Sequence, residues 1–196
     1  MERRHGQVGR PRSEQARTAV LRAVDDQLLE VGYAAMTMKG IAERAGVSRQ
    51  TVYRWWSTKA EILFEASAVD AEQELAVEPT GEPVDDLTAY VAALVDFLAR
   101  SPAGAAYRAL LGEAQHDPAV ADLLATKDVL GDSARTVIEG VLGAGAGAGP
   151  VPVGEATALL IGPAFFWVLS GRDPARLAPR ELAETFLREL RARGRH

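Results

Sequence analysis

The chain has 196 residues, a net charge of −5, 47% hydrophobic residues and no cysteine. This length suits one or two small domains, and the absence of cysteine excludes disulfides, thiolate metal sites and a cysteine nucleophile. The longest apolar run, Ala158–Leu169, is shorter than the about 20 residues that span a bilayer, and no apolar signal segment follows the basic N-terminus, so we expect a soluble cytoplasmic protein without a membrane partner.

The charge is divided unevenly along the chain. Residues 1–60 carry 11 Lys and Arg against 6 Asp and Glu, whereas residues 61–196 carry 11 against 21. Such asymmetry is typical of a protein in which one end binds a polyanion and the other forms a separate acidic module. Solvated helix faces produce the same imbalance by chance, so charge alone leaves both interpretations open.

A basic segment and a helix open the chain. Residues 1–12 mix arginine with glycine and proline and are predicted to form a disordered arm, which could lie along a DNA backbone or in a minor groove. Apolar residues then recur every three or four positions. This period predicts a helix with Ser13 as its N-cap and Gly32 as its C-terminal stop.

A helix-turn-helix pattern follows. Thr37 and Ser48 are placed to cap two short helices, over residues 38–45 and 49–56, and Gly46 permits the tight turn between them. In a helix-turn-helix, such a glycine-containing turn joins two short helices, and the second one lies in the DNA major groove. The pattern therefore predicts a DNA-reading element.

The second short helix divides into an inward and an outward side. Val52 and Trp56 are four residues apart and are predicted to pack inward on Ile41 and Ala42, with Val47 filling the angle between the helices. The outward side carries a dense set of hydrogen-bond donors. The predicted DNA contacts are Thr37, Lys39, Ser48, Arg49, Gln50, Thr51, Tyr53, Arg54, Trp55 and Lys59.

These contacts divide by chemistry. Arg49, Gln50 and Arg54 are the candidates for base edges, because Arg pairs bidentately with guanine and Gln with adenine. Tyr53, Lys59 and the free N–H groups of the helix that begins after Thr37 are placed to reach phosphate oxygens.

Longer helices make up the rest of the chain, and the predicted fold class is all-α. A capping box at Thr58–Glu61 starts a connector helix to about residue 76, and residues 78–83 form a Pro- and Gly-containing break. About five helices follow. They are predicted over residues 87–98 and 103–114, from Pro118 to 142 with a weak point at Gly131, over 156–170 with a kink at Pro163, and over 179–193.

Residues 10–65 resemble the N-terminal DNA-binding domain of TetR-family transcriptional regulators. The matching features are Gly32-Tyr33, Thr37, Ile41-Ala42, Ala45-Gly46-Val47-Ser48, Thr51-Val52-Tyr53 and Lys59. Trp55-Trp56 departs from the family, where His or Tyr followed by Phe is more usual. The remaining two-thirds resembles the family in its helix layout and in the segment GPAFFWVL followed by GRDP.

The resemblance implies a homodimeric regulator, mostly a repressor, whose two recognition helices enter successive major grooves of a palindromic double-stranded operator. A small ligand in the C-terminal domain would change their spacing, and the helices at 156–170 and 179–193 would form a four-helix dimer interface. The implied domains are a three-helix DNA-binding domain at 1–57, a connector helix and linker at 58–81, and a helical ligand-binding and dimerisation bundle at 82–196.

The ligand is expected to be small and hydrophobic or aromatic, because the second domain is apolar and helical bundles often leave a pocket between helices. The candidate lining residues are Tyr90, Phe97, Tyr107, His116, Phe166 and Trp167. The same residue types also build cores and dimer interfaces, so both interpretations stay open for each of them.

No enzyme, cofactor or metal site is predicted. Glu113 and His116 have the Glu-x-x-His spacing of a di-iron site, but such a site needs a second copy. The Gly-rich residues 143–152 follow no strand and are predicted to be a flexible loop. Two alternatives to a repressor remain: an activator, and a helical small-molecule-binding protein or enzyme with a vestigial DNA domain.

Overall fold

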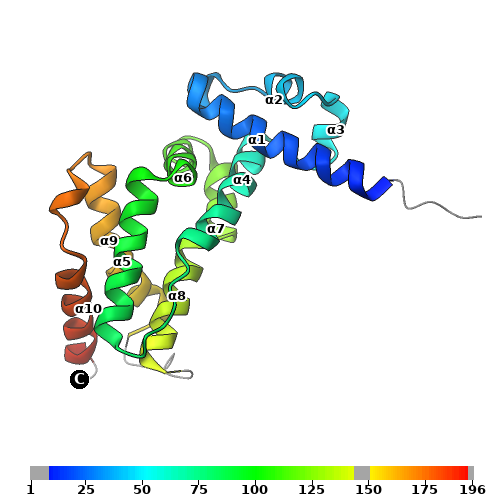
Figure 1. The fold of residues 1–196 in the computed structure, drawn as a ribbon. Helices are drawn as coiled ribbons and strands as arrows, with labels where there is room; N and C mark the ends of the chain where they lie inside the picture. The colour runs from blue at the N-terminus through cyan, green and yellow to red at the C-terminus, as the bar shows by residue number, and fades with distance from the viewer. Residues whose placement is uncertain (1–8, 144–150, 194–196) are drawn as a thin grey trace, which may run out of the picture. The chain divides into compact units, whose positions relative to one another are not determined.

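The computed structural model describes residues 9–143 and 151–193, which form helices and no strand, as predicted (Figure 1). The helices are α1 (Gly9–Ala35), α2 (Met38–Ala45), α3 (Arg49–Tyr53), α4 (Lys59–Glu74), α5 (Pro83–Arg100), α6 (Pro102–Glu113), α7 (Pro118–Thr126), α8 (Val129–Leu142), α9 (Val153–Leu169), the short 3-10 helix η2 (Pro174–Arg176) and α10 (Pro179–Arg193). The chain divides into two compact units, residues 1–67 and 68–196. This boundary falls inside α4, within the connector predicted at 58–81.

The first unit begins with α1, which is longer than the sequence predicts. Ser13 lies inside this helix, because α1 begins at Gly9, so the predicted N-cap is wrong. Pro11 does not prevent the earlier start, since the N–H groups of a first helical turn have no intrahelical partner. Gly32 interrupts α1 with φ 74° and ψ 166°, which confirms the predicted stop. Residues 1–8 of the predicted arm lie outside the described residues.

The core of the first unit draws apolar side chains from all four of its helices. Six of them have no exposed surface, namely Val20 and Val24 of α1, Ile41 of α2, Val52 of α3, and Ile62 and Leu63 of α4. The short helices α2 and α3 therefore owe their stability to packing, because isolated helices of this length are marginal in water.

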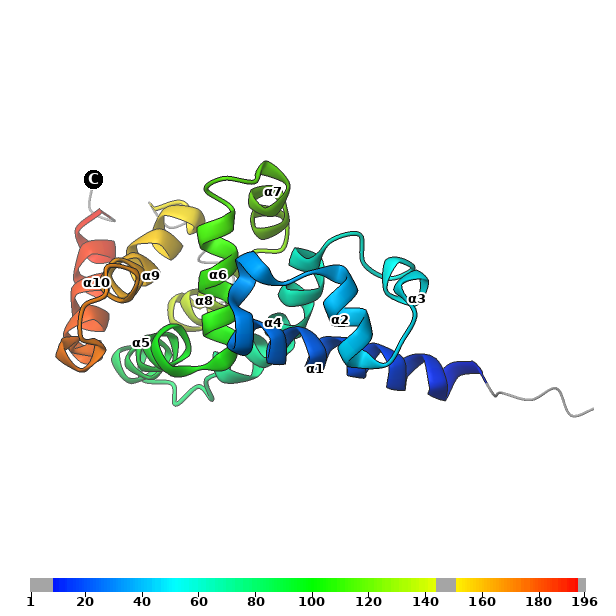
Figure 2. The same cartoon turned by 90° about the horizontal axis from the view of Figure 1, so that it is seen from above.

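Helix α5 contacts α6, α8, α9 and α10 in the second unit (Figure 2). The predicted amphipathic helix over 87–98 is confirmed. Leu87, Val91, Leu94 and Leu98 recur at helical spacing along α5, and none has exposed surface. The neighbouring helices therefore cover α5 from several sides.

The corner between α5 and α6 is unusually tight. Ser101 ends α5, and its Oγ accepts hydrogen bonds from the N–H groups of Ala103 and Gly104, at 3.1 and 3.3 Å. A Cβ added at Gly104 would lie 1.7 Å from the carbonyl oxygen of Phe97. Only glycine fits this position, because the obstructing atom belongs to the backbone.

The long helix predicted from Pro118 to residue 142 is two helices. The chain breaks between α7 and α8 at Lys127 and Asp128, and the weak point predicted at Gly131 is not where it divides. The reason is a cap: the Asp128 carboxylate accepts a hydrogen bond from the Gly131 N–H at 3.0 Å. Gly131 is thus part of the first turn of α8.

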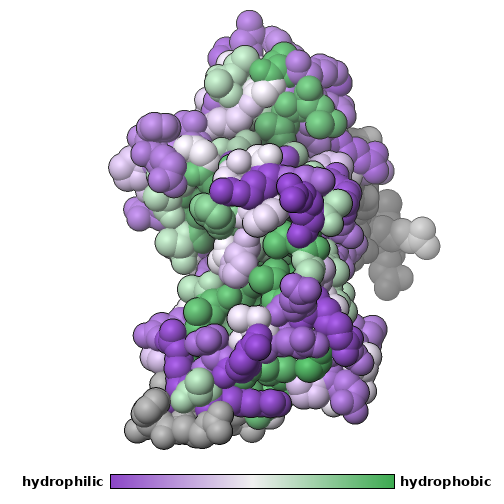
Figure 3. Space-filling model, turned by 90° about the vertical axis from the view of Figure 1, so that its left-hand side faces the viewer, coloured by the Kyte–Doolittle hydropathy of each residue, from purple (hydrophilic) through white to green (hydrophobic). Residues whose placement is uncertain are grey.

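Helix α9 has apolar side chains all round. Ala156, Leu160 and Ala164 are buried within the second unit, whereas Phe166 and Leu169 are 63% and 48% exposed. Figure 3 views the side of this unit formed by α9 and α10, where hydrophobic areas lie between hydrophilic ones. Pro163 lies inside α9. Most of the predicted loop at 143–152 falls on residues 144–150, outside the described residues.

Candidate DNA-binding site

Capping residues build the turn between α2 and α3, as predicted. At the start of α2, Thr37 Oγ1 accepts a hydrogen bond from the Gly40 N–H at 3.0 Å. Gly46 ends α2 in the left-handed conformation, with φ 66° and ψ 28°. Ser48 Oγ then accepts from the Thr51 N–H at 3.1 Å and starts α3.

Helix α3 ends earlier than predicted. It stops at Tyr53 rather than at residue 56, and the chain turns before α4. The turn follows from the way α4 begins: Glu61 N–H donates to Thr58 Oγ1 at 3.2 Å, and the Ser57 N–H donates to the Glu61 carboxylate at 2.7 Å. The predicted capping box is therefore present with one change, because the carboxylate binds the N–H of Ser57 in place of that of Thr58.

The inward side of α3 is as predicted. Val52 is fully buried and Trp56 is 3% exposed. The indole Nε1 of Trp56 donates a hydrogen bond to Glu65 Oε2 at 2.9 Å, and the other oxygen of that carboxylate pairs with Arg17 at 2.7 Å. The Glu65 carboxylate on α4 thus joins Arg17 of α1 to Trp56, which lies in the turn after α3. The roles of Glu65 and Arg17 were not predicted, because the only signal in the sequence is one charged residue in an apolar stretch.

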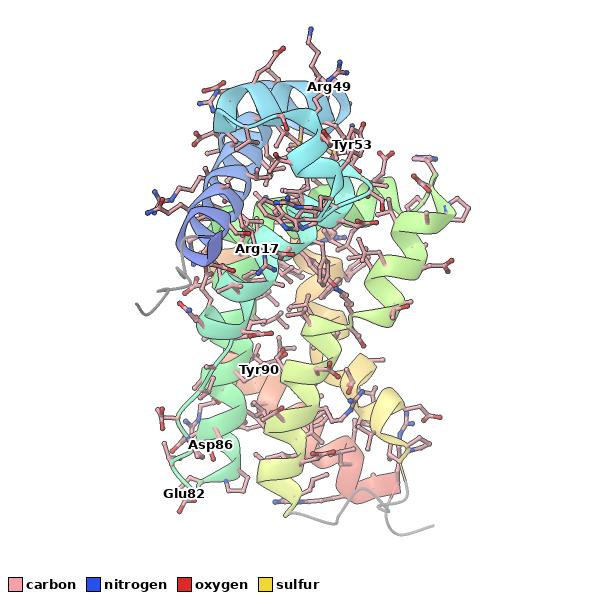
Figure 4. All side chains as sticks on the ribbon, turned by 90° about the vertical axis from the view of Figure 1, so that its right-hand side faces the viewer. Arg17, Arg49, Tyr53, Glu82, Asp86 and Tyr90 are labelled. Carbon is pink, nitrogen blue, oxygen red and sulfur yellow. The ribbon has the colours of Figure 1, made fainter. Side chains whose placement is uncertain are left out.

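The outward side of α3 carries free donors. Figure 4 shows Arg49 and Tyr53 on the outside of the first unit, and both are exposed, as are Gln50 and Arg54. The side chains of Arg49 and Gln50 make no hydrogen bond to any other described residue, so their donors are available to a base edge. A shallow hollow of about 550 Å³ runs along this side. Its lining residues are Ser48, Gln50, Thr51, Tyr53 and Arg54.

Arg54 rests on an aromatic side chain. Its guanidinium carbon lies 4.8 Å from the centre of the Trp55 ring, within the range of a cation–π contact. Trp55 in turn meets Trp56 edge-on, with ring centres 5.4 Å apart. The half-buried Trp55 therefore holds the Arg54 guanidinium against its ring, a role that was not predicted from the sequence.

Lys59 holds the end of α1 against the start of α4. Its ammonium donates to the carbonyl oxygens of Tyr33 and Met36, at 2.7 and 3.1 Å, and lies 4.2 Å from the centre of the Tyr33 ring. Two of its three N–H donors therefore act within the protein. The predicted phosphate contact would have to use the third. Lys39, the other predicted lysine, is exposed and lies 3.6 Å from Glu43.

We expect Lys59→Met to destabilise the first unit by about 1–3 kcal/mol, because two part-buried carbonyls lose a charged donor. Lys39→Met is the matched control, and we expect it to change stability by less than about 0.5 kcal/mol since its ion pair is exposed. Urea unfolding followed by tryptophan fluorescence measures both. Equal midpoints for the two variants would contradict the structural role of Lys59.

A second ionic contact fixes α2 on α1. The Arg44 guanidinium donates to both oxygens of Glu30, at 2.6 and 2.7 Å, and to Asp26 at 3.0 Å. Hydrogen bonds to Glu30 first, and then to Asp26, raise the pKa of Arg44. The pair is bidentate, so it sets orientation as well as distance. Nothing in the sequence pairs these residues, which come from two helices.

Three of the six candidate ligand residues are buried in the core of the second unit. Tyr90 and Phe97 lie on α5 and Tyr107 on α6, all three are buried, and the rings of Phe97 and Tyr107 are 6.3 Å apart. Burial raises the pKa of Tyr90 and of Tyr107 to about 12. The Tyr90 hydroxyl lies 2.9 Å from Ser133 Oγ. These side chains fill space between helices.

The other three candidates lie elsewhere. His116 is exposed beyond the end of α6, and Phe166 and Trp167 lie near the end of α9. Trp167 Nε1 donates to the Asp173 carbonyl at 2.8 Å, and the Arg172 guanidinium lies over both rings, 4.5 and 5.5 Å from their centres. The structure therefore does not bring the six candidates together in one pocket.

Two further properties concern the described parts of the chain. Among residues 9–143 and 151–193, no set of three or more His, Cys, Asp and Glu side chains is arranged to hold a metal ion. Within the same ranges, no helix combines the length and the apolar composition that crossing a bilayer requires.

Comparisons with known proteins agree with this geometry. Residues 77–192 match the domain family described as "Tetracyclin repressor-like, C-terminal domain", and residues 20–66 match "Bacterial regulatory proteins, tetR family". The chain is 33% identical over 186 residues to the HTH-type transcriptional regulator YdeS of Bacillus subtilis (strain 168), which covers 93% of this chain and 89% of YdeS.

Solved structures show the same architecture. The TetR family transcription regulator SCO0332 superposes with a TM-score of 0.65 at 25% identity, covering 90% of this chain and 97% of that one. Salmonella enterica GusR shares the fold, with a TM-score of 0.62 at 20% identity over 97% of this chain and all of its own. With both halves matched and the capped α2–α3 turn in place, the chain belongs to the TetR family of bacterial DNA-binding transcriptional regulators.

Proposed function

We propose that this protein is a homodimeric repressor that reads a palindromic operator with α3 and leaves it when a small ligand binds the second unit. The observation that carries the proposal is the outward side of α3. Arg49 and Gln50 stand free at its capped start, while Val52 and Trp56 hold the opposite side in the core. This arrangement presents side chains that pair bidentately with guanine and adenine to a major groove.

The apolar outer side of α9 supports the dimer. Phe166 and Leu169 are exposed in the single chain, although α9 contacts α5, α8 and α10 within the second unit. An exposed apolar patch on a soluble domain marks an interaction site. A two-fold dimer places the same patch on both partners and carries two copies of α3, which fits an operator with two related half-sites.

Release by a ligand requires only a difference in affinity between two conformations. Consider a conformer in which the two α3 helices of the dimer are spaced wrongly for the operator. A ligand that binds this conformer about 10⁴-fold more tightly moves its ratio to the DNA-binding conformer from 1:99 to 99:1. Phosphate contacts supply most of the affinity of such proteins, so we expect operator binding to fall steeply with salt. Helix α4 contains the boundary between the two units, and we infer that it transmits the change.

We expect Arg49→Ala and Gln50→Ala each to cost about 1–3 kcal/mol of discrimination between operator and random DNA, because each removes one bidentate base contact. Fluorescence anisotropy with the DNA upstream of the protein's own gene, against a random duplex of equal length, measures the ratio. Gln73→Ala is the control, since Gln73 is exposed on α4 in the second unit.

The same assay, combined with a ligand-binding measurement and a reporter gene, separates this function from the alternatives. Equal affinity of the native protein for both duplexes, combined with tight binding of a small molecule, would favour a ligand-binding protein without an operator. A reporter gene that becomes more active when the protein occupies the operator would identify an activator. Discrimination that is lost in the α3 variants and kept in Gln73→Ala, with a repressed reporter, would support the proposal.

A further inference from the structure

The second unit contains a groove. One of its sides is formed by the end of α4 and the residues that follow it, and the other by α8. Its volume is about 370 Å³, which is within the range of small-molecule sites. Leu75, Val77 and Val129 form apolar walls, and Glu72, Ser133 and Thr136 supply polar atoms. None of the six residues predicted to line a pocket belongs to its lining.

The two hydroxyl groups of the groove donate their protons to backbone carbonyl oxygens of α8. Ser133 Oγ donates to the Leu130 carbonyl at 2.9 Å, and Thr136 Oγ1 donates to the Asp132 carbonyl at 3.0 Å. A hydroxyl has one proton and two acceptor lone pairs. Both side chains therefore offer only hydrogen-bond acceptors to a molecule in the groove.

A buried tyrosine keeps Ser133 in this state. The Tyr90 hydroxyl lies 2.9 Å from Ser133 Oγ, and Figure 4 labels Tyr90 on α5. The phenol also donates to the Leu130 carbonyl oxygen, at 3.4 Å, so the Ser133 proton is taken up within this set of three groups, either by that oxygen or by the Tyr90 hydroxyl. Burial raises the pKa of Tyr90 to about 12, so the phenol keeps its proton at physiological pH. Ser133 thus retains one free lone pair and no free proton.

The charged groups of the groove are carboxylates. Asp132 pairs with Arg135 at 2.8 Å, which offsets its charge. Glu72 is exposed and forms no ion pair or hydrogen bond with the described residues. An ionised carboxylate also only accepts hydrogen bonds. The groove therefore combines apolar walls, one uncompensated negative charge and acceptors, without a side-chain donor from these hydroxyls.

We propose that this groove binds a lipophilic amine as the ligand of the regulator. The ammonium N–H groups would donate to Glu72, Ser133 and Thr136, while the hydrocarbon body would lie against the apolar walls. A carboxylate ligand would meet a like charge and no hydroxyl donor, so it is disfavoured. The proposal rests on the ligand-release function proposed above and adds the chemical class of the ligand and its site.

Three probes with one hydrocarbon body test the assignment: 4-phenylbutylamine, 4-phenylbutanol and 4-phenylbutanoate. Isothermal titration of the full-length protein without DNA is expected to show that the amine binds at least about tenfold more tightly than the other two, as a charge-assisted hydrogen bond provides. Equal binding of the amine and the carboxylate would overturn the proposal.

Substitutions place the amine in the groove. We expect Glu72→Gln to weaken amine binding about tenfold and Thr136→Val about threefold, whereas Glu78→Gln, which removes an exposed carboxylate outside the groove, should change it less than about twofold. Equal effects of Glu72→Gln and Glu78→Gln would mean that only the overall charge attracts the amine, and would overturn the site.

A second measurement separates the site from the function. Amine binding in the groove without release of operator DNA would contradict ligand release and would leave the groove assignment supported. Release of operator DNA by the alcohol or the carboxylate, with no effect of the amine, would contradict the groove assignment and leave ligand release supported.

Discussion

Trp56→Ala is expected to abolish operator binding. Trp56 is 3% exposed, and truncating a buried tryptophan costs about 3–5 kcal/mol, a large share of the stability of a domain as small as residues 1–67. The change also removes the indole donor that Glu65 accepts at 2.9 Å. Helix α3 has five residues and depends on this packing, so it should lose its position in the first unit.

Trp55→Ala is the matched control for this prediction. Trp55 is half-buried, and its contact with the Arg54 guanidinium is worth about 0.5–1 kcal/mol at an exposed site, so we expect weaker operator binding with an intact fold. Trp56→Phe should also fold, since it keeps an aromatic ring in the core. Anisotropy and urea unfolding measured by circular dichroism distinguish the three variants. Equal loss of operator binding in Trp55→Ala and Trp56→Ala would contradict the inward role of Trp56.

The helix-turn-helix was predictable from the sequence because its determinants are local. Thr37, Gly46 and Ser48 each act on N–H or carbonyl groups within four residues, so the residue types at fixed spacing specify the caps and the turn. The pairing of Glu65 with Trp56 and Arg17 was not predictable. It joins segments that are distant in the sequence, and nothing in one chain indicates which partner each charge finds.

In the second unit, too, local features were predictable from the sequence and contacts between distant segments were not. The spacing of apolar residues predicted α5 and the residues that it buries. This spacing does not indicate which helices surround α5. The six candidate ligand residues were chosen as aromatic or polar, and the structure puts Tyr90 in the core and leaves Phe166 on the surface. The groove along α8 was hidden because it depends on how the end of α4 and the residues after it lie beside α8, and on the hydrogen bonds that Ser133 and Thr136 make once that helix has formed.

Gly104→Ala is expected to destabilise the second unit by about 3 kcal/mol or more, since overpacking against a rigid neighbour costs about 1–3 kcal/mol even where side chains can adjust. The new Cβ would lie 1.7 Å from the Phe97 carbonyl oxygen, which belongs to the last turn of α5. Relief of this clash requires α5 and α6 to separate at the Ser101 corner. Because α5 contacts four other helices, that movement disturbs the core of the whole unit.

Gly112→Ala provides the control, because it makes the same chemical change in the same helix. A Cβ at Gly112 meets no atom within 4 Å, so the only consequence is the better helix propensity of alanine, a gain of about 0.5–1 kcal/mol. The two variants should therefore shift the urea midpoint of the second unit in opposite directions. A shift of both midpoints to higher urea would mean that the α5–α6 corner opens at little cost, and that Ser101, which caps α6, does not by itself hold the two helices this close together.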